Sequence, residues 1–228
     1  MTNTLNISSV MIFAAGRGTR MGAMTEHCPK PLVKVAGRPL LDYALESTQG
    51  IPTRVVNTHY LAEQIETHLV GQDVVVSHER DLLLDTGGGL TKALPLLDSN
   101  PVYTLNSDAI LRGPNPFDVL QSAWQDHMEC LLLCVRMERA IGRKGGGDFT
   151  FAEDGQLIRK GDMCYIGAQI TRIDGLTEIK EDVFSLNVLW NNAAKRGGLF
   201  GVEYPGHWCD VGHPEGIELA EDLLNSHV

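Results

Sequence analysis

Along its first 135 residues the chain alternates short, β-rich apolar runs with longer segments whose apolar residues recur at helical spacing. Residues 10–15 form a continuous apolar run, which is typical of a strand buried on both faces. In 61–70, Leu61, Ile65 and Leu69 mark one helical face. The pattern predicts strands at 10–15, 54–59, 74–79, 101–108 and 129–135, and helices at 39–47, 61–70, 89–97 and 116–127.

Strands that alternate with helices require right-handed crossovers between parallel neighbours. We therefore expect an α/β fold with a doubly wound, mostly parallel, Rossmann-like sheet. After residue 140 the pattern changes to short alternating runs between 147 and 171, which predict a small antiparallel addition. The remaining predicted elements are a helix at 185–197, a strand at 199–204 and a helix at 214–224.

The sequence contains no internal repeat and no linker composition. We expect a single domain over residues 1–228, with residues 1–9 as a polar N-terminal extension. Those nine residues lack the basic start and apolar core of a secretory signal, so a cytoplasmic location is predicted. The five cysteines form no CxxC pair, which indicates reduced thiols that mostly fill the core.

Composition and charge restrict the partners. Hydrophobic residues make up 43% and charged residues 21% of the chain, close to ordinary globular usage, and no apolar run is long enough to span a membrane. The formal net charge is −10, which repels polyanions. Nucleic acid and membrane surfaces are therefore not expected as partners.

One segment departs from this acidic balance. Between Gly16 and Arg38 the chain has four more basic than acidic residues. A local cluster of cations on an acidic protein favours a pocket for a small, multiply charged anion. A solvated basic loop is the alternative interpretation.

A glycine-containing turn follows the first predicted strand and lies at the start of this basic segment. Gly16 and Gly18 allow backbone N–H groups to surround an anion. The turn is neither a Rossmann fingerprint, whose third glycine would fall at Met21, nor a P-loop. Arg20 and Lys30 remain as phosphate ligands, and the flanking prolines predict an extended conformation for Lys30.

Two aspartates follow strand-like runs, Asp108 in YTLNSDA and Asp210 in HWCDVGH. In a parallel sheet such positions lie at the carboxyl edge, where ligands bind. Two carboxylates that meet there suit Mg²⁺, which completes its shell with water and substrate phosphates. Mg²⁺ is therefore the predicted cofactor.

Several ordered motifs resemble those of the sugar-1-phosphate nucleotidyltransferases: GRGTRM at 16–21, PKPL at 29–32, GRPL at 37–40, Asp108 and the W-x-D-x-G of 208–212. The resemblance is closer still to the bacterial N-acetylmuramate α-1-phosphate uridylyltransferases of peptidoglycan recycling, through the segments DTGGG, GGDFTF and GHWCDVG. Three positions depart from the family pattern: Ser107, which replaces glycine before the metal aspartate, His213, which replaces threonine, and Ala23, which replaces proline.

The resemblance implies that a sugar 1-phosphate attacks the α-phosphorus of an NTP and that pyrophosphate departs. It also implies UTP and N-acetylmuramate α-1-phosphate as substrates, with Arg20, Lys30 and Asp108 as the catalytic residues and Asp108 and Asp210 as metal ligands. Asn106, Asp148 and Asp210 would contact the sugar phosphate. The residues expected to bind the nucleotide are Ala14, Gly16, Gly18, Thr19, Arg20, Lys30, Gly87 and Gly88.

Other readings remain open at this point. The same chemistry fits mannose 1-phosphate with GTP or phosphocholine with CTP, and a non-catalytic paralogue that only binds a nucleotide sugar is a further alternative. The oligomeric state is expected to be a monomer or a small homo-oligomer. Roles for His59, His207 and Lys160 are not decided by the sequence.

Overall fold

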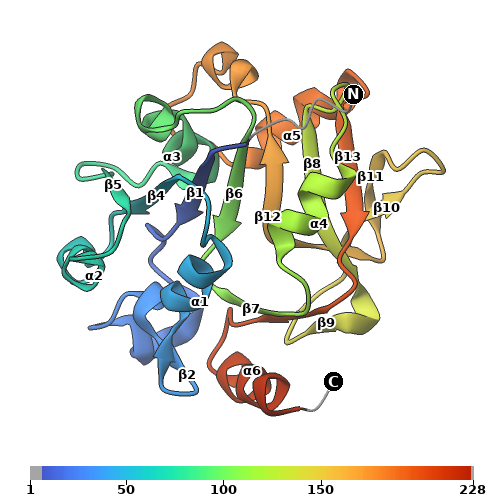
Figure 1. Cartoon of the computed structure of the whole chain (residues 1–228). Helices are drawn as coiled ribbons and strands as arrows, with labels where there is room; N and C mark the ends of the chain where they lie inside the picture. Colours follow the sequence, from blue (N-terminus) through green and yellow to red (C-terminus); the bar gives the residue numbers. More distant parts are fainter. Residues whose placement is uncertain (1–6, 227–228) are drawn as a thin grey trace.

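The computed structural model describes residues 7–226, and Figure 1 shows their arrangement around a central sheet of nine strands. One half of this sheet is wholly parallel, in the order β5–β4–β1–β6. The crossovers run through helices, as predicted. The strands of this half are β1 Ser9–Phe13, β4 Thr53–Thr58, β5 Val75–His78 and β6 Val102–Asn106.

In the other half, β12 lies between β6 and β8 and is antiparallel to both, while β13 is parallel to β8. The hairpin β10–β11 pairs with the start of β12. The predicted fold class is confirmed, and the antiparallel strands after residue 140 extend the main sheet itself. The strands of this half are β8 Cys130–Arg136, β10 Gly147–Phe151, β11 Leu157–Gly161, β12 Met163–Thr171 and β13 Leu199–Glu203.

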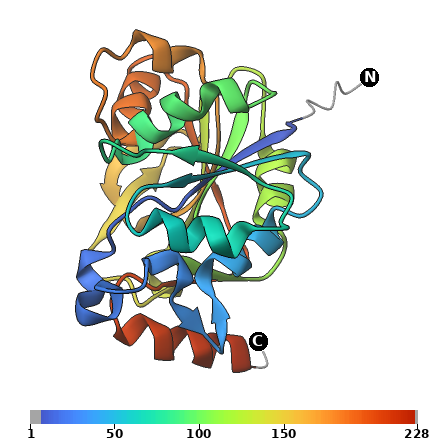
Figure 2. The same cartoon turned by 90° about the vertical axis from the view of Figure 1, so that its left-hand side faces the viewer.

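Helices cover both faces of the sheet (Figure 2). Alternate residues of β1 enter different cores: Val10 and Ile12 pack with α1, α2 and α4, whereas Met11 packs with α3 and α5. All three side chains have no exposed surface, and burying one contributes about 1.5–3 kcal/mol. The helices are α1 Leu40–Ser47, α2 Ala62–Leu69, α3 Asp85–Ala93, α4 Pro116–Ala123 and α5 Leu186–Lys195.

Smaller elements gather beyond the carboxyl ends of β1 and β6, at the bottom of Figure 1. A three-stranded sheet in the order β7–β14–β9 packs against α6 through a third apolar cluster that includes Ile110, Cys209 and Leu223. The elements at this end are β7 Ala109–Arg112, β9 Ala140–Ile141, β14 His207–Asp210, α6 Glu215–Asn225, the hairpin β2 Lys34–Val35 and β3 Arg38–Pro39, and short 3-10 helices at Thr19–Thr25, Lys30–Leu32 and Met137–Arg139. Two further 3-10 helices, Leu94–Leu96 and Asp174–Glu178, lie at the opposite edge of the sheet.

The structure shifts several predicted boundaries. The helix expected at 89–97 begins at Asp85 and tightens to a 3-10 turn at Leu94, next to Pro95. The helix expected at 116–127 ends at Ala123, because the following residue is extended. Of the predicted extension at 1–9, residues 1–6 lie outside the described residues. The prediction is wrong for the rest, since Ile7 is buried in the core and β1 begins at Ser9.

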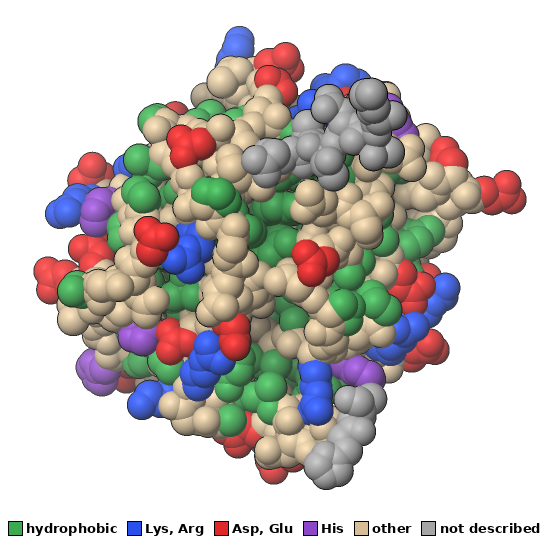
Figure 3. All heavy atoms as spheres, viewed as in Figure 1, with side chains coloured by type: hydrophobic (Ala, Val, Ile, Leu, Met, Phe, Trp, Pro, Cys, Tyr) green, Lys and Arg blue, Asp and Glu red, His purple; other side chains and the backbone are tan. Residues whose placement is uncertain are grey.

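All five cysteines are free and four are buried, so the prediction that they mostly fill the core is confirmed. Burial raises the pKa of Cys130 and Cys209 to about 12, so both stay protonated and unreactive at neutral pH. Among residues 7–226 no helix has the length and apolar character needed to cross a membrane. On the face seen in Figure 3, Lys and Arg side chains are interspersed with Asp and Glu.

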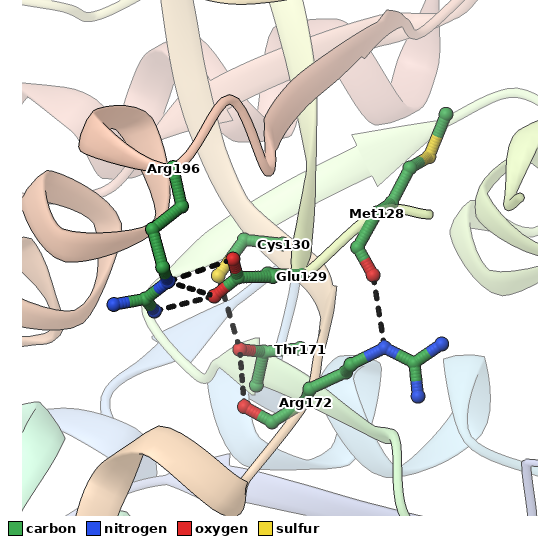
Figure 4. Close-up of polar contacts among 6 residues, drawn as sticks. All are labelled: Met128, Glu129, Cys130, Thr171, Arg172 and Arg196. Carbon is green, nitrogen blue, oxygen red and sulfur yellow. Dashed lines mark hydrogen bonds and ion pairs between the residues drawn. The ribbon is translucent and has the colours of Figure 1, made fainter. Parts of the chain in front are cut away.

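A polar network ties the start of β8 to α5 and β12, at the edge of the sheet away from the carboxyl ends (Figure 4). Arg196 donates from Nε and Nη2 to the two carboxylate oxygens of Glu129, at 2.9 and 2.5 Å. Arg172 donates from Nε to the Met128 carbonyl at 3.0 Å. These contacts join segments that are more than forty residues apart in sequence.

Arg196→Ala is expected to lower the free energy of unfolding by only about 0.5–1 kcal/mol, because both partners of the ion pair are partly exposed. Turnover should not change, since the network lies at the opposite edge from the cavities described below. Chemical denaturation and a steady-state assay check this. A large loss of activity without unfolding would show that the two edges are coupled.

Candidate active site

Two adjoining cavities of about 480 and 310 Å³ lie at the carboxyl edge of the main sheet. The larger cavity lies along residues 14–20 and the ends of β1, β4 and β6. The smaller cavity lies among β10, β11, β12 and α5. The two share a wall made by Arg20, Asp85, Thr86, Asn106 and Asp108.

The loop after β1 forms one wall of the larger cavity. Gly18 has φ +63°, and a Cβ there would lie 2.7 Å from the Cβ of Lys30, so both its backbone conformation and its close packing require glycine. A Cβ on Gly16 would meet nothing within 4 Å and would face open space. Ala14 donates its N–H to Asn57 Oδ1 at 2.7 Å, which fixes the start of the loop.

Lys30 is buried, with 7% of its surface exposed, and its Nζ donates to Asp108 Oδ2 at 2.7 Å. The predicted extended conformation is wrong for this residue. Pro29 is extended, but Lys30 begins a one-turn 3-10 helix whose Val33 N–H bonds to the Lys30 carbonyl. The turn directs the ammonium group into the larger cavity, which Lys30 lines.

Asp108 and Asp210 meet at the junction of the two cavities. The Val211 N–H donates to the Asp108 carbonyl at 3.1 Å, and β14 pairs Asp210 with Ala109. Burial raises the pKa of Asp210, and the nearby Asp108 carboxylate raises it further. Arg20 lies close by, because a Cβ on Gly212 would be 2.9 Å from Asp210 Oδ1 and 3.2 Å from Arg20 Nη1.

Asn106 and Asp148 lie on different strands of the same region. Asn106, at the end of β6, lines both cavities, and Asp148, on β10, lines the smaller one. Asp148 accepts from Arg143 Nη2 at 2.7 Å and from the Tyr165 N–H at 3.0 Å. The fold therefore places all three predicted sugar-contact residues, Asn106, Asp148 and Asp210, in the wall of the smaller cavity.

The structure does not place Gly87 and Gly88, which the resemblance predicts to bind the nucleotide, in the wall of either cavity. Both lie inside α3 and line neither cavity, and both donate their N–H groups to the Phe184 carbonyl. A Cβ on Gly87 would lie 2.3 Å from the Phe184 ring, and one on Gly88 would lie 2.2 Å from the Asp182 carbonyl oxygen. Packing against residues 182–184, rather than contact with a nucleotide, explains why these two positions are glycine.

Sequence reasoning missed a buried polar pair, Asn57 and Glu79, in the wall of the larger cavity. Glu79 is 1% exposed and accepts from Asn57 Nδ2 at 2.6 Å and from the Leu84 N–H at 2.9 Å. Asn57 in turn holds Ala14, so the chain of bonds braces the loop after β1. Their position in the sequence could have indicated a role in the site, since both residues lie near the carboxyl ends of predicted strands.

The smaller cavity also contains residues that the sequence did not suggest. Arg143, Arg159, Tyr165 and Trp190 line it, brought together from the loop between β9 and β10, from β11, from β12 and from α5. Asp85, at the shared wall, has φ +59°, a conformation that costs free energy for a non-glycine residue and that clusters at functional sites. Its Oδ1 accepts from the Thr86 N–H at 2.6 Å.

Comparison with known proteins decides the family. Residues 10–177 match the family model of the MobA-like NTP transferase domain. The chain belongs to this family. It is 34% identical to the N-acetylmuramate alpha-1-phosphate uridylyltransferase of Caulobacter vibrioides, over 94% of this chain and 96% of that protein. It is 31% identical to the protein of the same name from Neisseria meningitidis, over 95% of this chain and 98% of that protein.

Solved structures agree in fold. HddC from Yersinia pseudotuberculosis complexed with GMP-PN superposes with a TM-score of 0.76 at 20% identity, over 96% of this chain and all of that chain. The predicted family is confirmed, and with it the nucleotidyltransferase class.

The three residues whose roles the sequence leaves undecided lie outside both cavities of this NTP transferase fold. His59 contacts the Glu79 carbonyl through Nδ1 at 2.6 Å, and neither His207 nor Lys160 lines either cavity. Of the predicted basic segment, only Arg20 and Lys30 reach the site. Arg38 instead pairs with Glu46.

Two glycines of the nucleotidyltransferase loop are expected to respond oppositely to a side chain. Gly16→Val should leave the melting temperature unchanged but weaken NTP binding about tenfold or more, because its side chain enters the open cavity. Gly18→Ala should cost about 1–3 kcal/mol of stability through its positive φ and its contact with Lys30. Calorimetry of NTP binding and thermal unfolding separate the two effects. Equal loss of stability in both variants would contradict the assignment of Gly16 to the cavity surface.

Proposed function

We propose that the protein transfers a uridylyl group from UTP to N-acetylmuramate α-1-phosphate and releases pyrophosphate. The observation that carries this proposal is that two adjoining cavities meet at one cluster of opposite charges, made by Arg20, Lys30, Asp108 and Asp210. A triphosphate in the larger cavity and a sugar phosphate in the smaller one would bring their phosphates to this junction. The names of the Caulobacter and Neisseria relatives support the choice of UTP and this sugar.

The reaction needs no nucleophile from the protein. A phosphate oxygen of the sugar 1-phosphate attacks the α-phosphorus of the NTP, and the bond to the β-phosphate oxygen breaks. Catalysis then depends on positioning the two phosphates in line and on stabilising the charge that moves onto pyrophosphate. Residues at the junction of the cavities would supply both.

The two junction carboxylates fit a divalent cation, for which we propose Mg²⁺. Burial and the Asp108 carboxylate together raise the pKa of Asp210, so a cation held by both groups would relieve an unfavourable pair of negative charges. Two protein carboxylates are a suitable set for Mg²⁺, which keeps water and phosphate oxygens as its other ligands. When bound, the ion supplies charge neutralisation at the reacting phosphates.

Arg20 and Lys30 would act on the triphosphate. The exposed Arg20 guanidinium offers a forked set of donors for the departing pyrophosphate, together with the N–H groups of residues 16–19. Lys30 is a point charge that already pairs with Asp108. We propose that Lys30 turns from this carboxylate to the α-phosphate when substrates bind.

Binding roles follow from the cavity walls. Ala14, Gly16, Gly18 and Thr19 would contact the nucleotide, because they line the larger cavity. Asn106 would contact the sugar phosphate with an amide that both donates and accepts, and Asp148 would accept from a sugar hydroxyl or amide. A cytoplasmic location and a part in peptidoglycan recycling stay predictions.

Pyrophosphate release, measured with Mg²⁺ across four NTPs and a panel of acceptors that contains sugar 1-phosphates and phosphocholine, tests the proposal. UTP with N-acetylmuramate α-1-phosphate is expected to give the highest kcat/KM. A preference for GTP with mannose 1-phosphate, or for CTP with phosphocholine, would overturn the substrate assignment but keep the reaction. Nucleotide-sugar binding without any release would indicate a non-catalytic paralogue.

A further inference from the structure

Arg159 is a cation of the smaller cavity that has no carboxylate within 4 Å among residues 7–226. It lies on β11, opposite Phe149 on β10. Its Nε and Nη2 donate to the Asn191 side-chain oxygen at 3.2 and 2.9 Å. An amide oxygen is a neutral partner, so the charge of the guanidinium is not compensated by an ion pair.

The second guanidinium that belongs to the smaller cavity alone differs in this respect. Arg143 donates to Asp148 at 2.7 Å, and the other oxygen of Asp148 accepts from the Tyr165 N–H. Asp148 lines the same cavity as Arg159, but both of its carboxylate oxygens already accept hydrogen bonds from other donors. Of these two guanidinium groups, that of Arg159 is therefore the one whose charge is not compensated by an ion pair.

The guanidinium of Arg159 is held in a fixed plane. Its central carbon lies 4.8 Å from the centroid of the Phe149 ring and 5.6 Å from that of Trp190, distances at which cation–π attraction operates. Of the five N–H donors of an arginine, two point to Asn191, which leaves three for a ligand. An oriented fork of free donors is the arrangement that recognises a carboxylate through two parallel hydrogen bonds.

The position of Arg159 separates it from the reacting phosphates. Arg20, Asp108 and Asp210 lie at the junction with the larger cavity, whereas Arg159 lines only the smaller one. A sugar whose 1-phosphate occupied the junction would extend toward Phe149, Trp190 and Arg159. A neutral sugar would leave the three free donors with hydroxyl acceptors or water only.

We infer that Arg159 binds a carboxylate carried by the sugar itself and so selects acidic sugar 1-phosphates over neutral ones. This inference rests on the proposed function and adds a specificity residue to it. The guanidinium forms its two hydrogen bonds with the substituent and does not contact the reacting phosphates. Its contribution therefore falls on sugar recognition rather than on the chemical step.

The test compares two sugars that differ in the carboxylate. N-acetylmuramate α-1-phosphate carries a carboxylate on an ether substituent, and N-acetylglucosamine α-1-phosphate is the same sugar without that substituent. Steady-state kcat/KM with UTP and Mg²⁺ is measured for both sugars on the wild type and on Arg159→Met, which keeps the length and apolar contact of the side chain. Lys195→Met removes an exposed cation from α5 that lines neither cavity, and serves as the control.

Arg159→Met is expected to lower kcat/KM for the acidic sugar about 10- to 100-fold, mainly through KM, and to change the value for the neutral sugar less than about threefold. Arg159→Glu, which adds repulsion, should turn the preference toward the neutral sugar. Lys195→Met should keep the wild-type preference.

Equal losses on both sugars, or unchanged preference in both Arg159 variants, would overturn the inference while the proposed function stands. Absence of turnover with either sugar in the wild type would overturn the proposed function and the inference with it.

Discussion

Asp210→Asn is expected to lower kcat about 10³-fold, because loss of a metal-binding carboxylate costs several kcal/mol of transition-state stabilisation. The fold should not suffer. Burial and the Asp108 carboxylate disfavour the charged form of Asp210, so a neutral amide of the same shape removes an unfavourable charge pair. The melting temperature is expected to equal or exceed that of the wild type. Steady-state turnover with Mg²⁺ and thermal unfolding of the same preparation measure the two effects.

Asp73→Asn is the matched control for this prediction. The Asp73 side chain is 94% exposed and lies outside both cavities, so neither activity nor stability should change beyond small effects. Near-normal turnover of a folded Asp210→Asn variant would remove Asp210 from the metal site. A lower melting temperature would instead show that the carboxylate has a structural role.

Arg20→Ala is expected to lower kcat about 10²- to 10³-fold and to raise the KM for UTP, because a donor to the departing pyrophosphate gains strength as charge moves onto it. Arg20→Lys should keep part of the activity, since lysine supplies the charge without the two-oxygen fork. Steady-state kinetics at saturating sugar phosphate separate the two parameters. Loss confined to KM would mean that Arg20 binds ground and transition states equally.

Arg17→Ala provides the control for Arg20. Arg17 is exposed on the same loop but lines neither cavity, so its removal should change kcat/KM less than about threefold. Similar losses in both variants would indicate that the loop acts through its overall charge. Unchanged kinetics in Arg20→Ala would end the phosphate-site interpretation of the loop.

Features determined by local pattern were predictable from the sequence. The run at 10–15 is apolar at every position because both faces of β1 are covered, and that composition identifies a buried strand. Asp108 was predictable as a site residue because parallel strands bring their carboxyl ends to one edge. Lys30 and Arg20 were found through the charge of their segment, although the segment's other cations lie elsewhere.

Features determined by contacts between distant segments were not predictable. Gly87 and Gly88 look like a ligand loop in sequence, but their neighbours are residues 182–184, almost a hundred positions away. In the sequence Arg159 is one of two adjacent cations on an edge strand, and only the packing of α5 brings Asn191 and Trp190 beside it. Contacts between such distant segments depend on how the helices pack on the sheet, and no local sequence pattern encodes that packing.

The mass of the products formed from a sugar phosphate with isotopically heavy phosphate oxygens tests nucleotidyl transfer most directly. If the sugar 1-phosphate attacks the α-phosphorus of UTP, the UDP-sugar carries all of the label and the pyrophosphate carries none. Label in pyrophosphate, or UMP in place of a UDP-sugar, would contradict the reaction assigned to the junction of the two cavities.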